Sequence, residues 1–218
     1  MYFSLAFLQT LYQGGLFLIV LLIGLDLLSF FMFPNTLLSD IFIATREQTP
    51  LTWLSAVALL LLAFGSLSLY FQQRRSLWYW LALAFFFLSI DDAIYLHERL
   101  AGQVHDAVGF LSAFPSYLWL ILYLPLLLFT LGTLVYYLWQ HTSVKRSLLV
   151  LILILLGGAL LLDFVDGLMQ KNPTLLLCLE MSCQKIVLHL MRLTEEVIEV
   201  VAIGMLGYSL IRTSCLKE

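Results

Sequence analysis

Long apolar runs, separated by short polar stretches, follow one another along almost the whole chain. Six of these runs hold the roughly 20 apolar residues that a helix needs to cross the hydrocarbon core of a bilayer. They predict transmembrane helices at about residues 11–33, 51–71, 77–100, 117–140, 148–169 and 186–211. The pattern therefore predicts an all-α integral membrane bundle of six transmembrane helices, with residues 1–218 as a single transmembrane domain.

The composition agrees with a protein that lies in lipid. Hydrophobic residues make up 62% of the chain and charged residues only 11%, whereas a soluble domain usually carries about 25% charged residues. The net charge of -3 indicates no nucleic-acid partner. The first apolar run follows no Lys or Arg and has no small-residue cleavage site, so we expect a retained helix. The lipid bilayer is the expected partner.

Basic residues in the short loops predict the orientation of the bundle. With six crossings, one side receives both termini and the loops near residues 72–76 and 141–147. That side holds Arg74, Arg75, Lys145, Arg146, Arg212 and Lys217. The opposite loops hold Arg46, Lys171 and Lys185, with Arg99 and Arg192 at helix ends. By the positive-inside rule both termini are expected to be cytoplasmic.

Two of the three cysteines fall in the loop at about residues 170–185, on the predicted outer side. A disulfide between Cys178 and Cys183 suits an oxidising compartment. Two free thiols in a short amphipathic segment suit the sequence equally well, so both alternatives stay open.

Acidic residues are unusually frequent within the apolar runs. Nine of the 14 acidic residues lie inside or at the ends of the predicted helices. They are Asp26, Asp91, Asp92, Glu98, Asp163, Asp166, Glu195, Glu196 and Glu199. A charge at the bilayer centre costs at least about 2.5–3.5 kcal/mol on insertion scales, so unpaired carboxylates in this number would prevent insertion. Each must lie near an interface, carry a proton, pair with a base or bind a metal ion.

The alternating directions of the helices place these acids in one layer. Asp26 and the acids of the third and fifth predicted helices come late in helices that run outward. The glutamates of the sixth helix come in the first half of a helix that runs inward. The acids therefore converge in the half of the bundle that is remote from the termini, which the loop charges make the outer half.

The spacing of the polar residues predicts a metal site in this layer. On the last helix His189, Arg192, Glu196 and Glu199 form one stripe, because residues three and four apart share a face. Carboxylates and imidazoles that project from several helices into a bundle form di-iron and di-manganese sites. The expected ion is Fe, Mn or Zn. The predicted ligands are Asp91, Asp92, His97, Glu98, His189, Glu196 and Glu199. The predicted supporting groups are Asp26, Arg99, Asp163, Asp166, Arg192 and Glu195.

Other interpretations of the acidic layer remain open. Arg99, Arg192 and Lys185 lie at the right depth for ion pairs, but three bases cannot neutralise nine acids. The acids could titrate in a proton- or cation-coupled carrier, although the predicted inner half has almost none. They could also form hydrogen bonds in an accessory subunit of a larger membrane complex. The ligand types assign no reaction, so whether the chain is an enzyme stays open.

Two motifs resemble those of a known family. Ser89-Ile90-Asp91-Asp92 with His97-Glu98, and Glu195-Glu196-x-x-Glu199, are similar to the S-L-D-E…H-E and E-E-x-x-E patterns of uncharacterised small polytopic membrane proteins of bacteria and archaea. The resemblance covers about a third of the chain. It implies a prokaryotic cytoplasmic (inner) membrane and supports the third and sixth helices as the site, without implying an activity. Asp92 stands where the family pattern has Glu, so whether it reaches a shared ion stays open.

Overall fold

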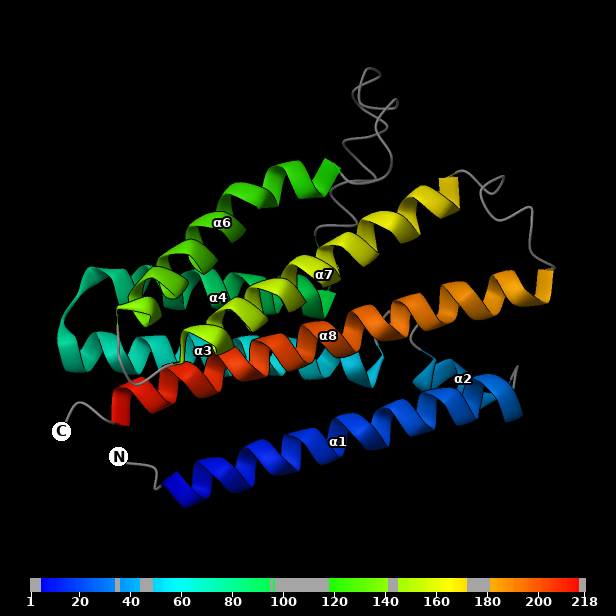
Figure 1. Cartoon of the computed structure of the whole chain (residues 1–218), viewed down its shortest axis with the longest axis horizontal. Helices are drawn as coiled ribbons and strands as arrows, with labels where there is room; N and C mark the ends of the chain where they lie inside the picture. Colours follow the sequence, from blue (N-terminus) through cyan, green and yellow to red (C-terminus); the bar gives the residue numbers. More distant parts are fainter. Residues whose placement is uncertain are drawn as a thin grey trace.

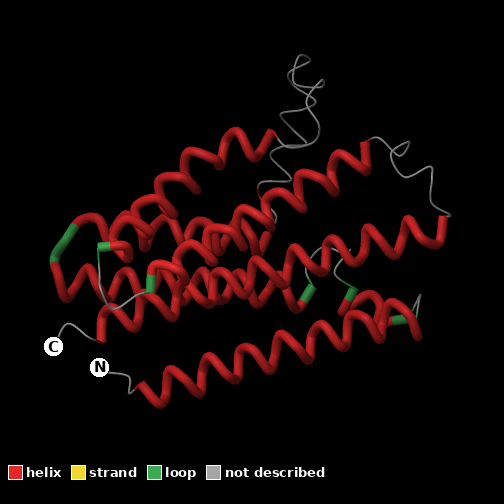
Figure 2. The backbone as a smooth tube through the Cα atoms, viewed as in Figure 1, coloured by secondary structure: helices red, strands yellow, loops and turns green. Residues whose placement is uncertain are grey.

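The computed structural model describes residues 5–33, 36–43, 49–94, 96, 118–140, 145–171 and 181–215. Seven helices and no strand make up these ranges (Figure 2). They are α1 (Leu5–Met32), α2 (Leu37–Phe42), α3 (Pro50–Gln73), α4 (Ser76–Ile94), α6 (Leu118–Trp139), α7 (Arg146–Lys171) and α8 (Met181–Cys215). The prediction of an all-α protein is confirmed. The six long helices overlap the six predicted runs, whereas the short α2 was not predicted.

Four helices of the described ranges are long and apolar enough to cross a membrane. The apolar stretches are Gln13–Met32, Pro50–Gln73, Ser76–Ile94 and Arg146–Asp166. A shorter apolar stretch, Tyr123–Trp139, lies in α6. The 35 residues of α8 include four charged residues close together, at positions 192, 195, 196 and 199. The chain is therefore a helical membrane protein.

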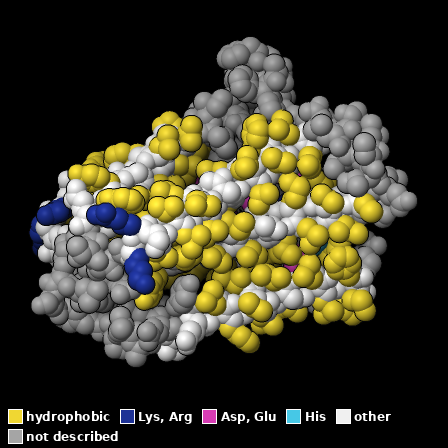
Figure 3. Space-filling model, viewed as in Figure 1, with side chains coloured by type: hydrophobic (Ala, Val, Ile, Leu, Met, Phe, Trp, Pro, Cys, Tyr) yellow, Lys and Arg dark blue, Asp and Glu magenta, His cyan; other side chains and the backbone are white. Residues whose placement is uncertain are grey.

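The long helices lie side by side, and α8 is central among them (Figure 1). It packs along α7 and α3, while α3 also packs along α4. At one edge α1 contacts α2, α8 and α3, and on the other side α6 contacts α4, α7 and α8. Consecutive long helices run in opposite directions, so α1 begins and α8 ends at the same end of the bundle. Arg74 and Arg75 lie between α3 and α4, and Lys145 and Arg146 lie at the start of α7, so all four belong to this end, which we call the basic end. Lys and Arg side chains gather there in the view of Figure 3.

Local interactions set both ends of α3. Thr49 caps its first turn, because the Thr49 side chain accepts a hydrogen bond from the backbone N–H of Thr52, and Pro50 follows. At the other end Arg74 adopts a left-handed conformation with φ of 54° and ψ of 25°. Its N–H donates to the carbonyl of Tyr70 at 2.8 Å. The helix thus has a defined start beside α8 and a tight turn into α4.

The half of the bundle next to the basic end is filled by one apolar core. Its side chains come from α3, α4, α6, α7 and α8, and Trp78, Phe85, Leu134, Ile152 and Leu206 are almost fully buried there. Small residues let α3 and α8 approach each other. A methyl group added to Gly207 would lie 3.6 Å from a methyl carbon of Leu62, and one added to Gly65 would lie 3.7 Å from Leu210.

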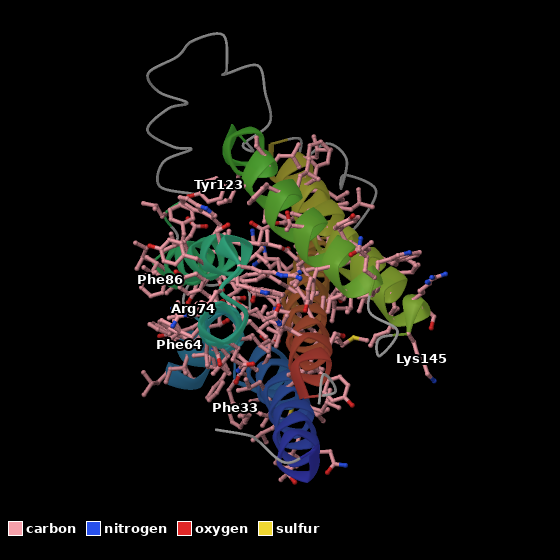
Figure 4. The ribbon with its side chains drawn as sticks, turned by 90° about the vertical axis from the view of Figure 1, so that its left-hand side faces the viewer. Phe33, Phe64, Arg74, Phe86, Tyr123 and Lys145 are labelled. Carbon is pink, nitrogen blue, oxygen red and sulfur yellow. The ribbon has the colours of Figure 1, made fainter. Side chains whose placement is uncertain are left out.

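Neighbouring phenylalanines on α4 test this core. Phe85 is 1% exposed, whereas the side chain of Phe86 points outward and is 47% exposed (Figure 4). We expect Phe85→Ala to lower the free energy of unfolding in micelles by about 3–5 kcal/mol, because it leaves a cavity. Phe86→Ala should change it by less than about 1 kcal/mol, since lipid or detergent replaces the ring. Equal losses for the two variants would contradict the assignment of the core.

Candidate functional site

One face of α8 carries polar side chains, and successive ones along the helix contact different neighbouring helices. Towards α1, His189 Nε2 lies 2.7 Å from Asp26 Oδ1, and both side chains are fully buried. The imidazole stacks on Phe30 with ring centroids 3.9 Å apart and an interplanar angle of 2°. This pair and the ring stack attach the edge helix α1 to α8.

Towards α7, Arg192 forms an ion pair with Asp166. Its Nε donates to Asp166 Oδ2 at 2.9 Å, with the side chains 29% and 8% exposed respectively. The sequence placed Arg192 at the depth of the acids as a possible counter-charge, and Asp166 is the acid that it pairs with. One of the two α7 acids is therefore paired with a base of α8, Arg192.

Towards α3, the acids meet a row of hydroxyl groups. Thr52 Oγ1 donates to Glu196 Oε1 at 3.2 Å and lies 3.0 Å from Thr49 Oγ1. Ser55 Oγ donates to Asp92 Oδ2 on α4, and Thr52 O is a second acceptor for it at 2.8 Å. These hydroxyls orient Glu196 and Asp92 from the same face of α3.

The two adjacent aspartates of α4 point to different helices. Asp92 contacts α3, whereas Asp91 Oδ1 accepts a hydrogen bond from Tyr123 of α6 at 2.8 Å. One turn earlier, Ser89 Oγ donates to the carbonyl of Ala56 at 2.7 Å and holds α4 against α3. Tyr123 lies near the start of α6, and its hydroxyl group meets the last turn of α4. Asp91 and Asp92 are thus separated by the rotation of the helix between successive residues.

Glu199 of α8 has other carboxyl groups nearby. Asp92 of α4, Asp163 of α7 and its own neighbours Glu195 and Glu196 are close enough for their charges to act on its carboxyl group, and the Glu199 side chain is half-buried. We call these five residues the carboxylate cluster. Arg192 is the base that acts on Glu195 within it. The described residues thus place five carboxylates from three helices beside a single arginine, which already pairs with Asp166.

The predicted ligands divide into three groups in space. Glu196, Glu199 and Asp92 belong to the carboxylate cluster, with Glu195 and Asp163 beside them, whereas Asp91 faces α6 and His189 faces α1. His97, Glu98 and Arg99 lie outside the described residues, as does Cys178, while Cys183 is exposed near the start of α8. Within the described ranges no three His, Cys, Asp or Glu side chains are close enough to hold a metal ion. Metal ligation and the disulfide therefore stay predictions.

Four site residues were not predicted from the sequence. Thr49, Thr52 and Ser55 are spaced three apart at the start of α3, so they share a face, and this spacing is the signal that could have revealed them. Their depth matches that of the acids, since α3 begins at the end of the bundle where α8 also begins. Tyr123 has no such pattern around it, and its contact with Asp91 is visible only in the folded bundle.

Residues 15–213 match a protein family described as a domain of unknown function, DUF8692. The chain belongs to this family. No curated protein and no solved structure matches the chain. The match extends over most of the 218 residues and includes all or part of each of the six long helices.

The Asp26–His189 pair can be tested by a double-mutant cycle. Asp26→Val and His189→Leu should each lower the free energy of unfolding by roughly 3–5 kcal/mol, because each leaves a buried polar group without its partner. The double variant should recover most of this loss, since both groups are then apolar. Chemical unfolding in micelles measures all four proteins, and strictly additive losses would contradict the pairing.

Proposed function

We propose that this protein binds one or two transition metal ions (Fe, Mn or Zn) in the acidic outer half of a six-helix membrane bundle. The observation that supports this most is the carboxylate cluster around Glu199. Five half-buried carboxylates within a membrane bundle need positive charge or protons, because unpaired charges that are removed from water are very unfavourable. Arg192 is the base that the described residues place there. A bound cation supplies the missing charge.

The proposed ligands come from facing helices, as in other bundle metal sites. Glu196 and Glu199 of α8 and Asp92 of α4 would bind the ion, with Asp163 and Glu195 as bridging groups. His97 and Glu98 follow α4 in the sequence and would add the nitrogen ligand and a further carboxylate. The Thr52 and Ser55 hydroxyls bind Glu196 and Asp92, and such neighbours orient metal ligands.

Two predicted ligands have a different place in this proposal. His189 Nε2 contacts Asp26, so His189 would bind an ion through Nδ1, which has no hydrogen-bond partner within the described part of the chain. Asp91 would not bind the ion. It accepts a hydrogen bond from Tyr123, which would hold the end of α4 and so keep the neighbouring Asp92 in place. A redox or hydrolytic reaction on a lipophilic substrate suits an ion held inside a membrane bundle.

Six membrane crossings are part of the proposal. The 22 residues of α6 extend over about 33 Å, which matches a hydrocarbon core of about 30 Å. The 35 residues of α8 are more than long enough, and α8 packs against four neighbouring helices. The basic end would lie in the cytoplasm of a prokaryote, so the acidic half would lie in the outer leaflet of the inner membrane.

The structure disfavours a proton- or cation-coupled carrier. The core of Trp78, Phe85, Leu134 and Leu206 fills the half next to the basic end. No Asp or Glu of the described ranges lies in that half. A carrier needs polar groups along the whole path, whereas the described acids stop at this core.

Elemental analysis of the protein, purified without chelator, tests the metal site. We expect about one or two equivalents of Fe, Mn or Zn. Glu196→Gln and Glu199→Gln should each lower the metal content at least about tenfold, because each removes a negative ligand. Asp40→Asn, which changes an exposed carboxyl group on α2, is the control and should leave it unchanged.

Less than roughly 0.2 equivalents of any transition metal in the wild-type protein would overturn the proposal. If the metal-free protein also co-purified with one constant membrane protein, the accessory-subunit alternative would replace it. A flux of protons or cations into liposomes that is lost in Glu196→Gln would favour the carrier.

The orientation can be tested with two single-cysteine variants. Cys183 is exposed near the start of α8, and Cys215 is the last residue of that helix, at the basic end. A membrane-impermeant maleimide added to intact cells should label the variant that retains Cys183. The variant that retains Cys215 should react only after the membrane is permeabilised. The reverse result would place the acidic half on the cytoplasmic side.

A further inference from the structure

A second feature of the molecule lies far from the acids, at the basic end. Arg74 and Arg75 follow α3, and Lys145 and Arg146 lie at the start of α7; all four side chains are exposed. Lys and Arg side chains gather at this end of the molecule in the view of Figure 3. The described Asp and Glu residues all lie towards the other end, so no carboxylate of these ranges neutralises the four bases.

The turn between α3 and α4 holds a charge at a position that favours glycine. Arg74 has a φ of 54°, and it is the one non-glycine residue with positive φ in the described ranges. Left-handed backbone is unfavourable for a residue with a Cβ atom, and glycine usually ends helices in this way. This turn places the exposed side chain of Arg74 next to that of Arg75.

Exposed aromatic rings lie at the same level as these bases. The guanidinium of Arg74 lies 6.0 Å from the ring centroid of Phe71, and that of Arg146 lies 5.3 Å from the ring of Trp139. Trp80 and Tyr136 are also exposed near this end. Tryptophan and tyrosine gather where membranes meet water, at the depth of the lipid headgroups. The basic side chains are therefore at the depth of the lipid phosphates.

We propose that the basic end is a binding surface for anionic phospholipids, formed by Arg74, Arg75, Lys145 and Arg146. Figure 4 places Arg74 and Lys145 on different sides of this end, so the surface meets several headgroups and is not a single pocket. Guanidinium groups that lie over Phe71 and Trp139 keep N–H donors free for phosphate oxygens. The neighbouring exposed rings favour lipid over a soluble acidic partner, because exposed tryptophan and tyrosine side chains suit the headgroup region of a membrane.

The test measures which lipids remain with the purified protein. Wild type is delipidated in detergent, equilibrated with an equimolar mixture of phosphatidylcholine and phosphatidylglycerol, and its bound lipid is measured by mass spectrometry. Each Lys or Arg near an anionic membrane surface raises the affinity for that surface by about fivefold. We therefore expect wild type to enrich phosphatidylglycerol at least about fivefold, and this enrichment should fall in high salt.

Two double variants remove the charges from one turn at a time. Arg74→Gly/Arg75→Gln should lower the enrichment at least about threefold and should not unfold, because glycine suits the left-handed position. Lys145→Gln/Arg146→Gln should have a similar effect. Lys185→Gln, which changes an exposed lysine at the opposite end of α8, should leave the enrichment unchanged. No preference in wild type, or an equal loss in Lys185→Gln, would overturn the proposal, whatever the metal content of the protein.

Discussion

The arrangement of the bundle depends on the burial of charged and polar groups along one face of α8. Such groups are costly within a membrane unless they meet partners, and they are therefore directed to the interior of a bundle. The face of α8 meets α1 through His189, α7 through Arg192 and α3 through Glu196. A helix with this face is stable only when several neighbours surround it. This requirement explains why the last helix in the sequence is central in the fold.

The apolar core fills the half of the bundle next to the basic end, and the layer of acids stops where this core begins. Phe85 and Leu206 pack tightly there, and small residues such as Gly65 and Gly207 bring α3 and α8 together. Above this core the same two helices present hydroxyl and carboxyl groups to each other. If the acids bind an ion as proposed, this contrast implies that the ion would reach them from the end remote from the basic end or from the lipid.

The sequence predicted the long helices because bilayer thickness sets the length of each apolar run, and a run of that length is easily recognised. It also predicted the common depth of the acids, since depth follows from alternation alone. It could not predict partners, because hydropathy does not determine how each helix is rotated or which helices are neighbours. Asp91 and Asp92 were grouped as ligands of one site, yet they bind Tyr123 and Ser55 on different helices.

The charge balance of the carboxylate cluster links metal binding to protons. Arg192 pairs with Asp166 and also acts on Glu195, so this one base is shared between at least two carboxyl groups. Carboxyl groups this close together repel one another when they are ionised, so a bound cation or protons must offset their charge. A divalent ion would displace these protons when its ligands bind. Metal affinity should therefore fall as the pH falls, and the hydroxyls of Thr52 and Ser55 suit both states, since a hydroxyl can donate to a carboxylate or accept from a carboxylic acid.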